Sequence, residues 1–131
     1  MSKLQVALIG CGGRGRGHAR VLKEFDDVEL VALCDPVEAI RDAAADEFRV
    51  GERYASVEEM LNTESLDVVF VATPAHLNGQ AALPCLAHGV NTLLEKPPGV
   101  SVAETTALRD AAARTGAKCM VGWNRRFHPI I

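Results

Sequence analysis

Short apolar segments alternate with longer amphipathic segments along the whole chain. The apolar segments are nearly continuous in valine, leucine, isoleucine and alanine, which is typical of strands covered on both faces of a parallel sheet. We expect such strands at Leu4–Ile9, Val28–Cys34, Val68–Ala72, Asn91–Leu94 and Lys118–Val121, with a short further strand at Arg53–Ala55.

The segments between these strands carry the start and stop signals of helices. Ser56 followed by Glu59 is a capping box, and Ser101 opens a second one. Gly116 stands where a helix C-cap is expected. Pro84 is expected to kink its helix or to delay the helix start, because proline lacks the backbone N–H. The expected helices are Arg14–Phe25, Val37–Phe48, Ser56–Asn62, Leu77–His88 and Ser101–Thr115.

This alternation predicts an α/β protein with a doubly wound, mostly parallel sheet in three layers. The length of 131 residues fits a single domain, residues 1–131, with a core of its own. A hydrophobic content of 48% with 24% charged residues is ordinary for a soluble globular protein.

Charge and hydropathy exclude some classes of partner. The net charge is −3 and the pI about 5.8, so no basic field is available to hold a nucleic acid. The local run of Arg14, Arg16 and Arg20 suits a small phosphate ligand better than a polymer. The apolar segments are far shorter than the roughly 20 residues that a membrane helix needs, so no membrane partner is expected.

The cysteines Cys11, Cys34, Cys85 and Cys119 are too far apart in sequence for a zinc site, and no metal is expected. Each lies in or beside an apolar segment, so we expect small buried thiols in a reducing compartment. The chain begins directly with a strand pattern and without a signal peptide. A cytoplasmic protein is therefore expected.

The first strand runs into Gly10-Cys11-Gly12-Gly13-Arg14-Gly15, which matches the pattern G-x-G-x-x-G between a strand and a helix. Gly10 would form the tight turn, Gly12 would let the backbone approach a diphosphate, and Gly15 would let the helix pack on the strand. Gly13 and Arg14 open that helix, whose N-terminal amides attract phosphate. The alternative is a flexible glycine-rich turn without a ligand.

Asp35 follows Gly15 by about 20 residues, at the end of the second strand, where a carboxylate binds the adenosine ribose in a Rossmann-type site. A carboxylate there repels a ribose 2′-phosphate, and Pro36 rather than an arginine comes next. Asp35 followed by Pro36 therefore favours NAD over NADP as the cofactor. S-adenosylmethionine sites also use glycine-rich loops, so the loop alone leaves the ligand open.

Three polar segments follow later strands, on the side where open α/β sheets bind ligands. They are Thr73-Pro74-Ala75-His76, Glu95-Lys96-Pro97-Pro98 and Asn124-Arg125-Arg126-Phe127. With the glycine loop, their order and spacing resemble those of the glucose–fructose oxidoreductase / inositol dehydrogenase (Gfo/Idh/MocA) family. The resemblance covers the chain from Leu4 to Pro129.

The resemblance implies an N-terminal NAD(P)-binding Rossmann domain whose C-terminal substrate domain is absent from these 131 residues. It also implies hydride transfer between NAD and the CH–OH group of a sugar, inositol or related polyol. The catalytic Asp and His of the family's second domain have no counterpart here. Two departures from the usual pattern are Asn78, where many members have histidine, and Gly99 after Pro98.

The resemblance also implies residue roles. Lys96 would be the catalytic residue beside the nicotinamide, and Glu95 would contact the cofactor or hold Lys96. Because the neighbouring carboxylate favours the charged lysine, a general base and a charged positioning group both stay open as roles of Lys96. Thr73, Pro74 and His76 would line the cofactor cleft, while Asn124 and Arg125 would close over the nicotinamide. The expected cofactor-binding residues are Gly10, Gly12, Gly13, Arg14, Gly15, Asp35, Thr73, Pro74, His76, Glu95, Lys96, Asn124 and Arg125.

Three functions follow from these observations. The favoured one is the cofactor domain of an NAD-dependent oxidoreductase, inactive by itself. A stand-alone NAD-binding module is the alternative, and a methyltransferase-type domain is the least favoured. The sequence does not indicate a particular substrate, and it is compatible with a homo-oligomer. His18 and His88 are expected to be helix residues without a role.

Overall fold

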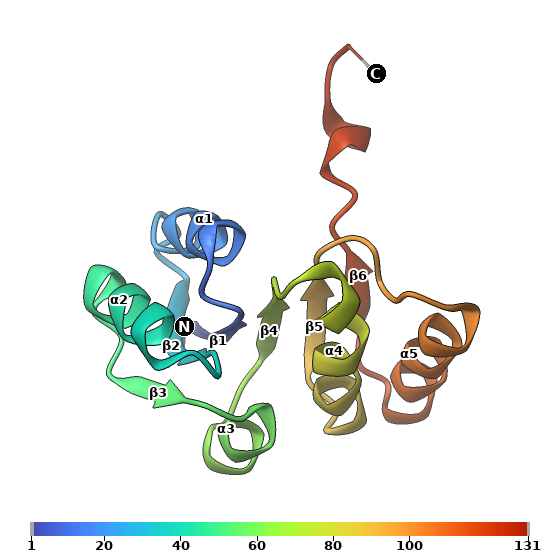
Figure 1. Cartoon of the computed structure of the whole chain (residues 1–131), viewed down its shortest axis with the longest axis horizontal. Helices are drawn as coiled ribbons and strands as arrows, with labels where there is room; N and C mark the ends of the chain where they lie inside the picture. The colour runs from blue at the N-terminus through green and yellow to red at the C-terminus, as the bar shows by residue number, and fades with distance from the viewer. Residues whose placement is uncertain (1, 131) are drawn as a thin grey trace.

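The computed structural model describes residues 2–130, which form one parallel six-stranded sheet flanked by helices. The strand order is β3-β2-β1-β4-β5-β6, the order of a Rossmann fold, so the predicted doubly wound α/β class is confirmed. Figure 1 shows the carboxyl ends of β4, β5 and β6 at the same edge. The strands are β1 (Leu4–Ile9), β2 (Val28–Cys34), β3 (Glu52–Tyr54), β4 (Val68–Val71), β5 (Asn91–Leu94) and β6 (Cys119–Val121).

Helices cover the sheet on both sides and complete three layers. The helices α1 (Gly13–Leu22) and α2 (Glu38–Phe48) share one core cluster with the sheet. On the other face lie α3 (Val57–Thr63), α4 (Asn78–Ala87) and α5 (Val102–Thr115). Two short 3₁₀ turns are η1 (Ala75–Leu77) and η2 (Asn124–Phe127).

Alternating residues of β1 feed the two core clusters. Val6 and Leu8 pack with α1 and α2, whereas Ala7 and Ile9 pack with the cluster beneath α3, α4 and α5. These residues are at most 3% exposed, which explains the unbroken apolar run seen in the sequence. The central strand therefore fixes where the loop that follows it lies.

The expected element bounds differ from the structure mainly at helix ends. Helix α1 ends at Leu22 rather than Phe25, because the amides of Glu24 and Phe25 bond to carbonyls only three residues back and tighten the last turn. Pro84 lies inside α4 and does not delay its start. The serine half of each predicted capping box is confirmed: Ser56 and Ser101 accept the amides at the third position of α3 and α5, while the Glu104 carboxylate accepts the amide of Val100 and not that of Ser101.

The expectation of four buried cysteines is wrong for Cys119. Cys11, Cys34 and Cys85 are buried, but Cys119 is exposed because it lies on β6, the last strand of the sheet. Burial raises the pKa of Cys11 to about 12, that of Cys34 to about 11 and that of Cys85 to about 12. These three thiols stay protonated and behave as small apolar side chains.

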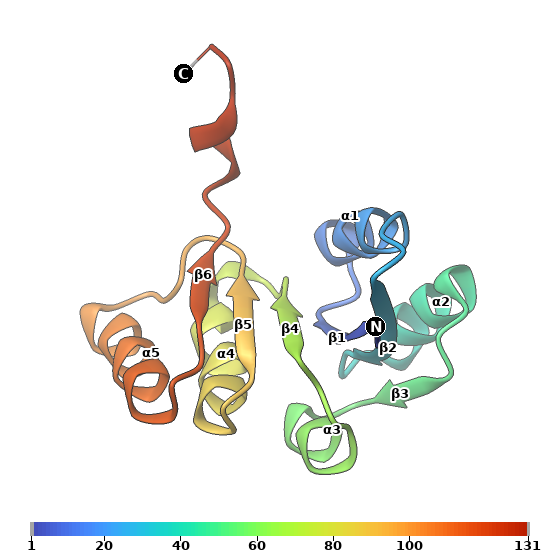
Figure 2. The same cartoon turned by 180° about the vertical axis from the view of Figure 1, so that it is seen from behind.

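One face of the sheet's far half is open in the described part of the chain. Figure 2 shows β5 and β6 in front of α4 and α5, with no helix of residues 2–130 covering these two strands on the near side. The open face carries Leu93 and the half-exposed Met120, and it is bordered by Phe70, which packs against His18 of α1. From the end of β6, the last residues run away from the sheet (Figures 1 and 2). None of the helices described has the length and apolarity to cross a membrane.

Candidate functional site

The site lies where the strand order reverses, between β1 and β4. The loops after β1, β2 and β4 meet there around a cleft of about 680 Å³. Open α/β sheets bind ligands at this point because the chain leaves neighbouring strands in opposite directions. The cleft has the size of a small-molecule or cofactor site.

Two glycines build the loop after β1. Gly10 has a φ of 91°, and a Cβ there would lie 2.5 Å from the carbonyl oxygen of Ala72. A Cβ on Gly15 would lie 1.8 Å from the carbonyl oxygen of Gly10. No side chain fits at either position, so both glycines are required by the turn and by the close packing of α1.

Two other glycines leave the loop open. At Gly12 and Gly13 a Cβ would meet nothing within 4 Å, and both residues line the cleft. Gly12 is the N-cap of α1, which has no side-chain cap and no acidic residue in its first turn. The helix therefore presents unpartnered amides and its positive end to an open space, which fits a diphosphate group.

Asp35 lies directly after β2 and its carboxylate is fixed against the glycine loop. One oxygen accepts the amide of Cys11 at 3.0 Å, and the other accepts the amide of Val37 at 2.9 Å. Each oxygen keeps lone pairs for further donors such as sugar hydroxyl groups. The predicted placement is present, since Asp35 contacts the glycine loop and lines the cleft.

Apolar residues form the wall of the cleft beside Asp35. Val37 comes from the segment before α2, Ala55 from the loop after β3, and Leu77 from η1. Such a slot suits a flat aromatic ring system. No pattern in the sequence points to these residues, because they come from separate segments that only the tertiary structure brings together.

The segment after β4 is held by a buried amide. Thr73 lines the cleft, and its hydroxyl donates to the side-chain oxygen of Asn78 at 2.8 Å. The Asn78 amide nitrogen donates to the carbonyl oxygens of Glu95 at 3.1 Å and Pro97 at 3.4 Å. Asn78, 1% exposed, thus ties the loops after β4 and β5 together. The sequence marked it only as a departure from the family pattern.

Glu95 at the end of β5 is buried, with 7% of its surface exposed. Its Oε1 lies 2.8 Å from Nε2 of His18 and 3.1 Å from Nε of Arg14, both on α1. No ion pair with Lys96 is present among the described residues. His18, expected to lack a role, is therefore a partner of Glu95, which only the tertiary structure could reveal.

The structure gathers only part of the predicted site. Gly10, Gly12, Gly13, Arg14, Asp35, Thr73 and Pro74 line the cleft, and Gly15 lies directly behind it.

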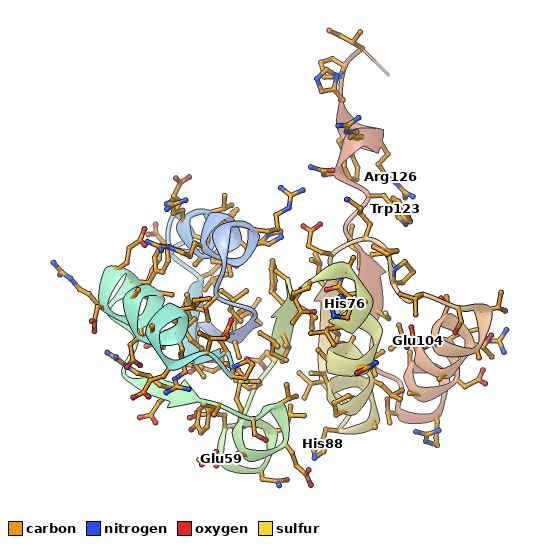
Figure 3. The ribbon with its side chains drawn as sticks, viewed as in Figure 1. Glu59, His76, His88, Glu104, Trp123 and Arg126 are labelled. Atoms are coloured by element: carbon orange, nitrogen blue, oxygen red, sulfur yellow. The ribbon has the colours of Figure 1, made fainter. Side chains whose placement is uncertain are left out.

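The other predicted residues lie outside the cleft lining. Lys96 is exposed beyond β5, and Figure 3 shows His76 in the segment between β4 and α4. Asn124 and Arg125 lie in η2, on the terminal segment that Figure 3 marks with Trp123 and Arg126. Their predicted contacts with a cofactor stay predictions.

Fold and cleft together define a dinucleotide-binding domain of the Rossmann type. The chain belongs to the oxidoreductase family with an NAD-binding Rossmann fold, GFO_IDH_MocA, whose model matches residues 4–123. The resemblance noted in the sequence is thus confirmed.

Relatives of known function match all or nearly all of the chain. D-apiose dehydrogenase of Paraburkholderia graminis is 33% identical over 100% of this chain and 35% of its own length. A glycosyl hydrolase family 109 protein of Shewanella sp. is 31% identical over 97% of this chain and 30% of its own length. The crystal structure of GenD2 from gentamicin A biosynthesis, in complex with NAD, has a TM-score of 0.91 at 31% identity. It covers 98% of this chain and 37% of that one. The chain thus spans about a third of the length of these relatives.

Proposed function

We propose that this chain is the NAD-binding domain of a dehydrogenase that transfers hydride to or from the CH–OH group of a sugar, inositol or related polyol. The observation that carries the proposal is the uncapped N-terminus of α1 facing the open space at Gly12 and Gly13. Membership of an NAD-binding oxidoreductase family and likeness to a dehydrogenase and to an NAD complex support it.

We propose further that the site prefers NAD to NADP. The Asp35 carboxylate is fixed at the loop by two amides, so it cannot turn away from a ribose bound beside it. It would accept ribose hydroxyl hydrogens and repel a phosphate at the same position. Arg41 lies close by, but its guanidinium donates to the Asp35 carbonyl oxygen at 3.1 Å.

Bound NAD would supply the group that accepts the substrate's hydride. Lys96 would then take the hydroxyl proton as a base or stabilise the alkoxide as a charged donor. Lys96 follows Glu95, whose backbone and side chain are both fixed, so the lysine starts from a rigid point at the carboxyl edge of the sheet. Asn124 and Arg125 would complete the nicotinamide end in the full-length protein.

The substrate pocket belongs, in this proposal, to a further domain of the full-length protein. The relatives are about three times as long as this chain, and they include both a dehydrogenase and a glycosidase. Since both share this domain, parts outside it choose the substrate and the reaction. The 131-residue chain by itself should bind NAD but should not turn over an alcohol.

Calorimetric titration of the chain with NADH tests the proposal. Gly12→Val should abolish binding, because its side chain would fill the space meant for the diphosphate. The fold should survive, since Gly12 has an extended backbone with φ −74° and free space at its Cβ. Gly17→Ala is the matched control: Gly17 lies in the same helix, also with free space, and is not part of the cleft lining.

The wild type and Gly17→Ala should bind NADH alike. Absence of NADH binding by the wild type, or tight binding of S-adenosylmethionine in its place, would overturn the proposal. Equal NADH binding by the wild type and the valine variant would exclude the loop as the phosphate site.

A further inference from the structure

A buried carboxylate lies behind the phosphate loop. Glu95 is 7% exposed and stands at the end of β5, away from the surface of the cleft. A carboxylate in such a place is costly unless charged or polar donors compensate it.

Both donors come from α1. His18 and Arg14 meet the same oxygen, at 2.8 and 3.1 Å. They are four residues apart in the sequence, so they lie on the same face of the helix, one turn apart. Glu95 therefore connects the end of β5 to the first turns of the helix that follows the phosphate loop.

Arg14 reaches both the carboxylate and the cleft. It contacts Glu95 through Nε, while 54% of its side chain is exposed and the residue lines the cleft. An arginine bound through Nε keeps the NH1 and NH2 groups for another anion. The contact with Glu95 thus fixes the plane of the guanidinium and leaves its two terminal nitrogens available beside the phosphate loop.

His18 fixes the carboxylate in turn. Its ring packs edge-on against Phe70, with centroids 5.5 Å apart and planes at 72°. A carboxylate offers only acceptors, so the contact with Glu95 requires the hydrogen of the His18 ring on Nε2. The ring is therefore fixed by β4 on one side and by the carboxylate on the other.

We propose that His18 and Glu95 are positioning residues for Arg14, and that together they hold its guanidinium against the diphosphate of the bound dinucleotide. This inference rests on the proposed NAD-binding function and adds to it a coupling between the phosphate site and the segment that carries Lys96. Both residues act through Arg14 and touch no ligand themselves.

The test measures NADH and adenosine affinity by calorimetry for the whole chain and its variants. His18→Leu removes the donor and should weaken NADH binding about tenfold, the effect of losing one charge-assisted contact. Adenosine, which has no diphosphate, should bind His18→Leu as it binds the wild type. His18→Gln retains an amide donor and should restore NADH affinity to within about twofold.

A double-mutant cycle separates positioning from a general structural effect. In the Arg14→Ala background, His18→Leu should cause no further loss of NADH affinity. His88→Leu is the matched control and should leave NADH affinity unchanged, because Figure 3 shows His88 at the end of α4 away from the carboxyl edge of the sheet.

Three results would overturn the inference. The first is an unchanged NADH affinity in His18→Leu. The second is an equal loss of adenosine and NADH affinity in that variant. The third is a loss of NADH affinity on His18→Leu that is just as large in the Arg14→Ala background. Should His18→Leu not fold, Glu95→Gln takes its place in the same cycle, since it removes the charge and keeps the shape. A wild type that binds no NADH would instead refute the proposed function.

Discussion

Single residues explain most of what the sequence could predict about the site. Gly10 and Gly15 are read correctly because each has one physical reason, a positive φ or a contact that excludes any side chain. The position of Asp35 beside the cleft is predicted from its spacing in sequence after the glycine loop. Asn78 and His18 could not be found this way, since their importance comes from partners such as Glu95 that are distant in sequence.

At the same scale, Asp35→Ser should narrow the preference for NADH over NADPH. The serine removes the negative charge that repels a 2′-phosphate and keeps a small polar group. The affinity for NADH should fall, and the ratio of the two dissociation constants should move toward one. Asp26→Ser, an exposed position outside the cleft, serves as the charge-matched control. An unchanged ratio in Asp35→Ser would remove Asp35 from the ribose site.

Elements were predicted well where strong local signals exist. The strands β1, β2 and β5 have the expected bounds, because their apolar runs are bounded by turn residues. Helix ends differ from the prediction, as the early end of α1 and the 3₁₀ turn before α4 show. Tertiary contacts determine these ends, and no periodicity in the sequence reports them.

The caps of α3 and α5 allow a test at the element scale. Ser101→Ala removes the side chain that accepts the Glu104 amide at 3.1 Å, and it should lower the free energy of unfolding by about 1 kcal/mol. Figure 3 shows Glu104 on α5, where its carboxylate also accepts the Val100 amide at 2.7 Å. Ser65→Ala, exposed and outside any helix, should change the urea midpoint little. An equal change in the urea midpoint for Ser101→Ala and Ser65→Ala would argue against a stabilising N-cap at Ser101.

The molecule as a whole shows which predictions required the assembled structure. The parallel order and the three layers follow from the alternation of strands and helices. The sequence could not show that Lys96, Asn124 and Arg125 lie outside the cleft lining, nor that Met120 lies on an open face. Burial of a residue depends on every element that covers it, and Cys119 was wrongly placed for that reason.

Stability at alkaline pH is a property of the whole core. In the folded chain the thiol pKa is about 12 for Cys11, about 11 for Cys34 and about 12 for Cys85, against an ordinary value of 9.0. The unfolded chain loses these protons first. The folded state therefore binds more protons above about pH 9, and its stability falls as pH rises from there toward 12.

Urea unfolding at pH 8, 9 and 10 would measure this fall, with a reducing agent present. Cys85→Ala should make it shallower, because one buried thiol no longer contributes. A free energy of unfolding that stays constant or rises over this range would contradict the expected protonation of the core.

The bare start of α1 has one more consequence. Helices α3 and α5 each begin after a serine whose side chain accepts one of their first amides, so their N-termini are capped in the free protein. Helix α1 has no such residue and leaves its first amides to whatever enters the cleft. A bound dinucleotide would then take the place of the missing N-cap side chain of this helix. Binding of the dinucleotide and ordering of the first turn of α1 around Gly12 would then be coupled. A substitution that introduced an N-cap side chain there would compete with the ligand for the same amides.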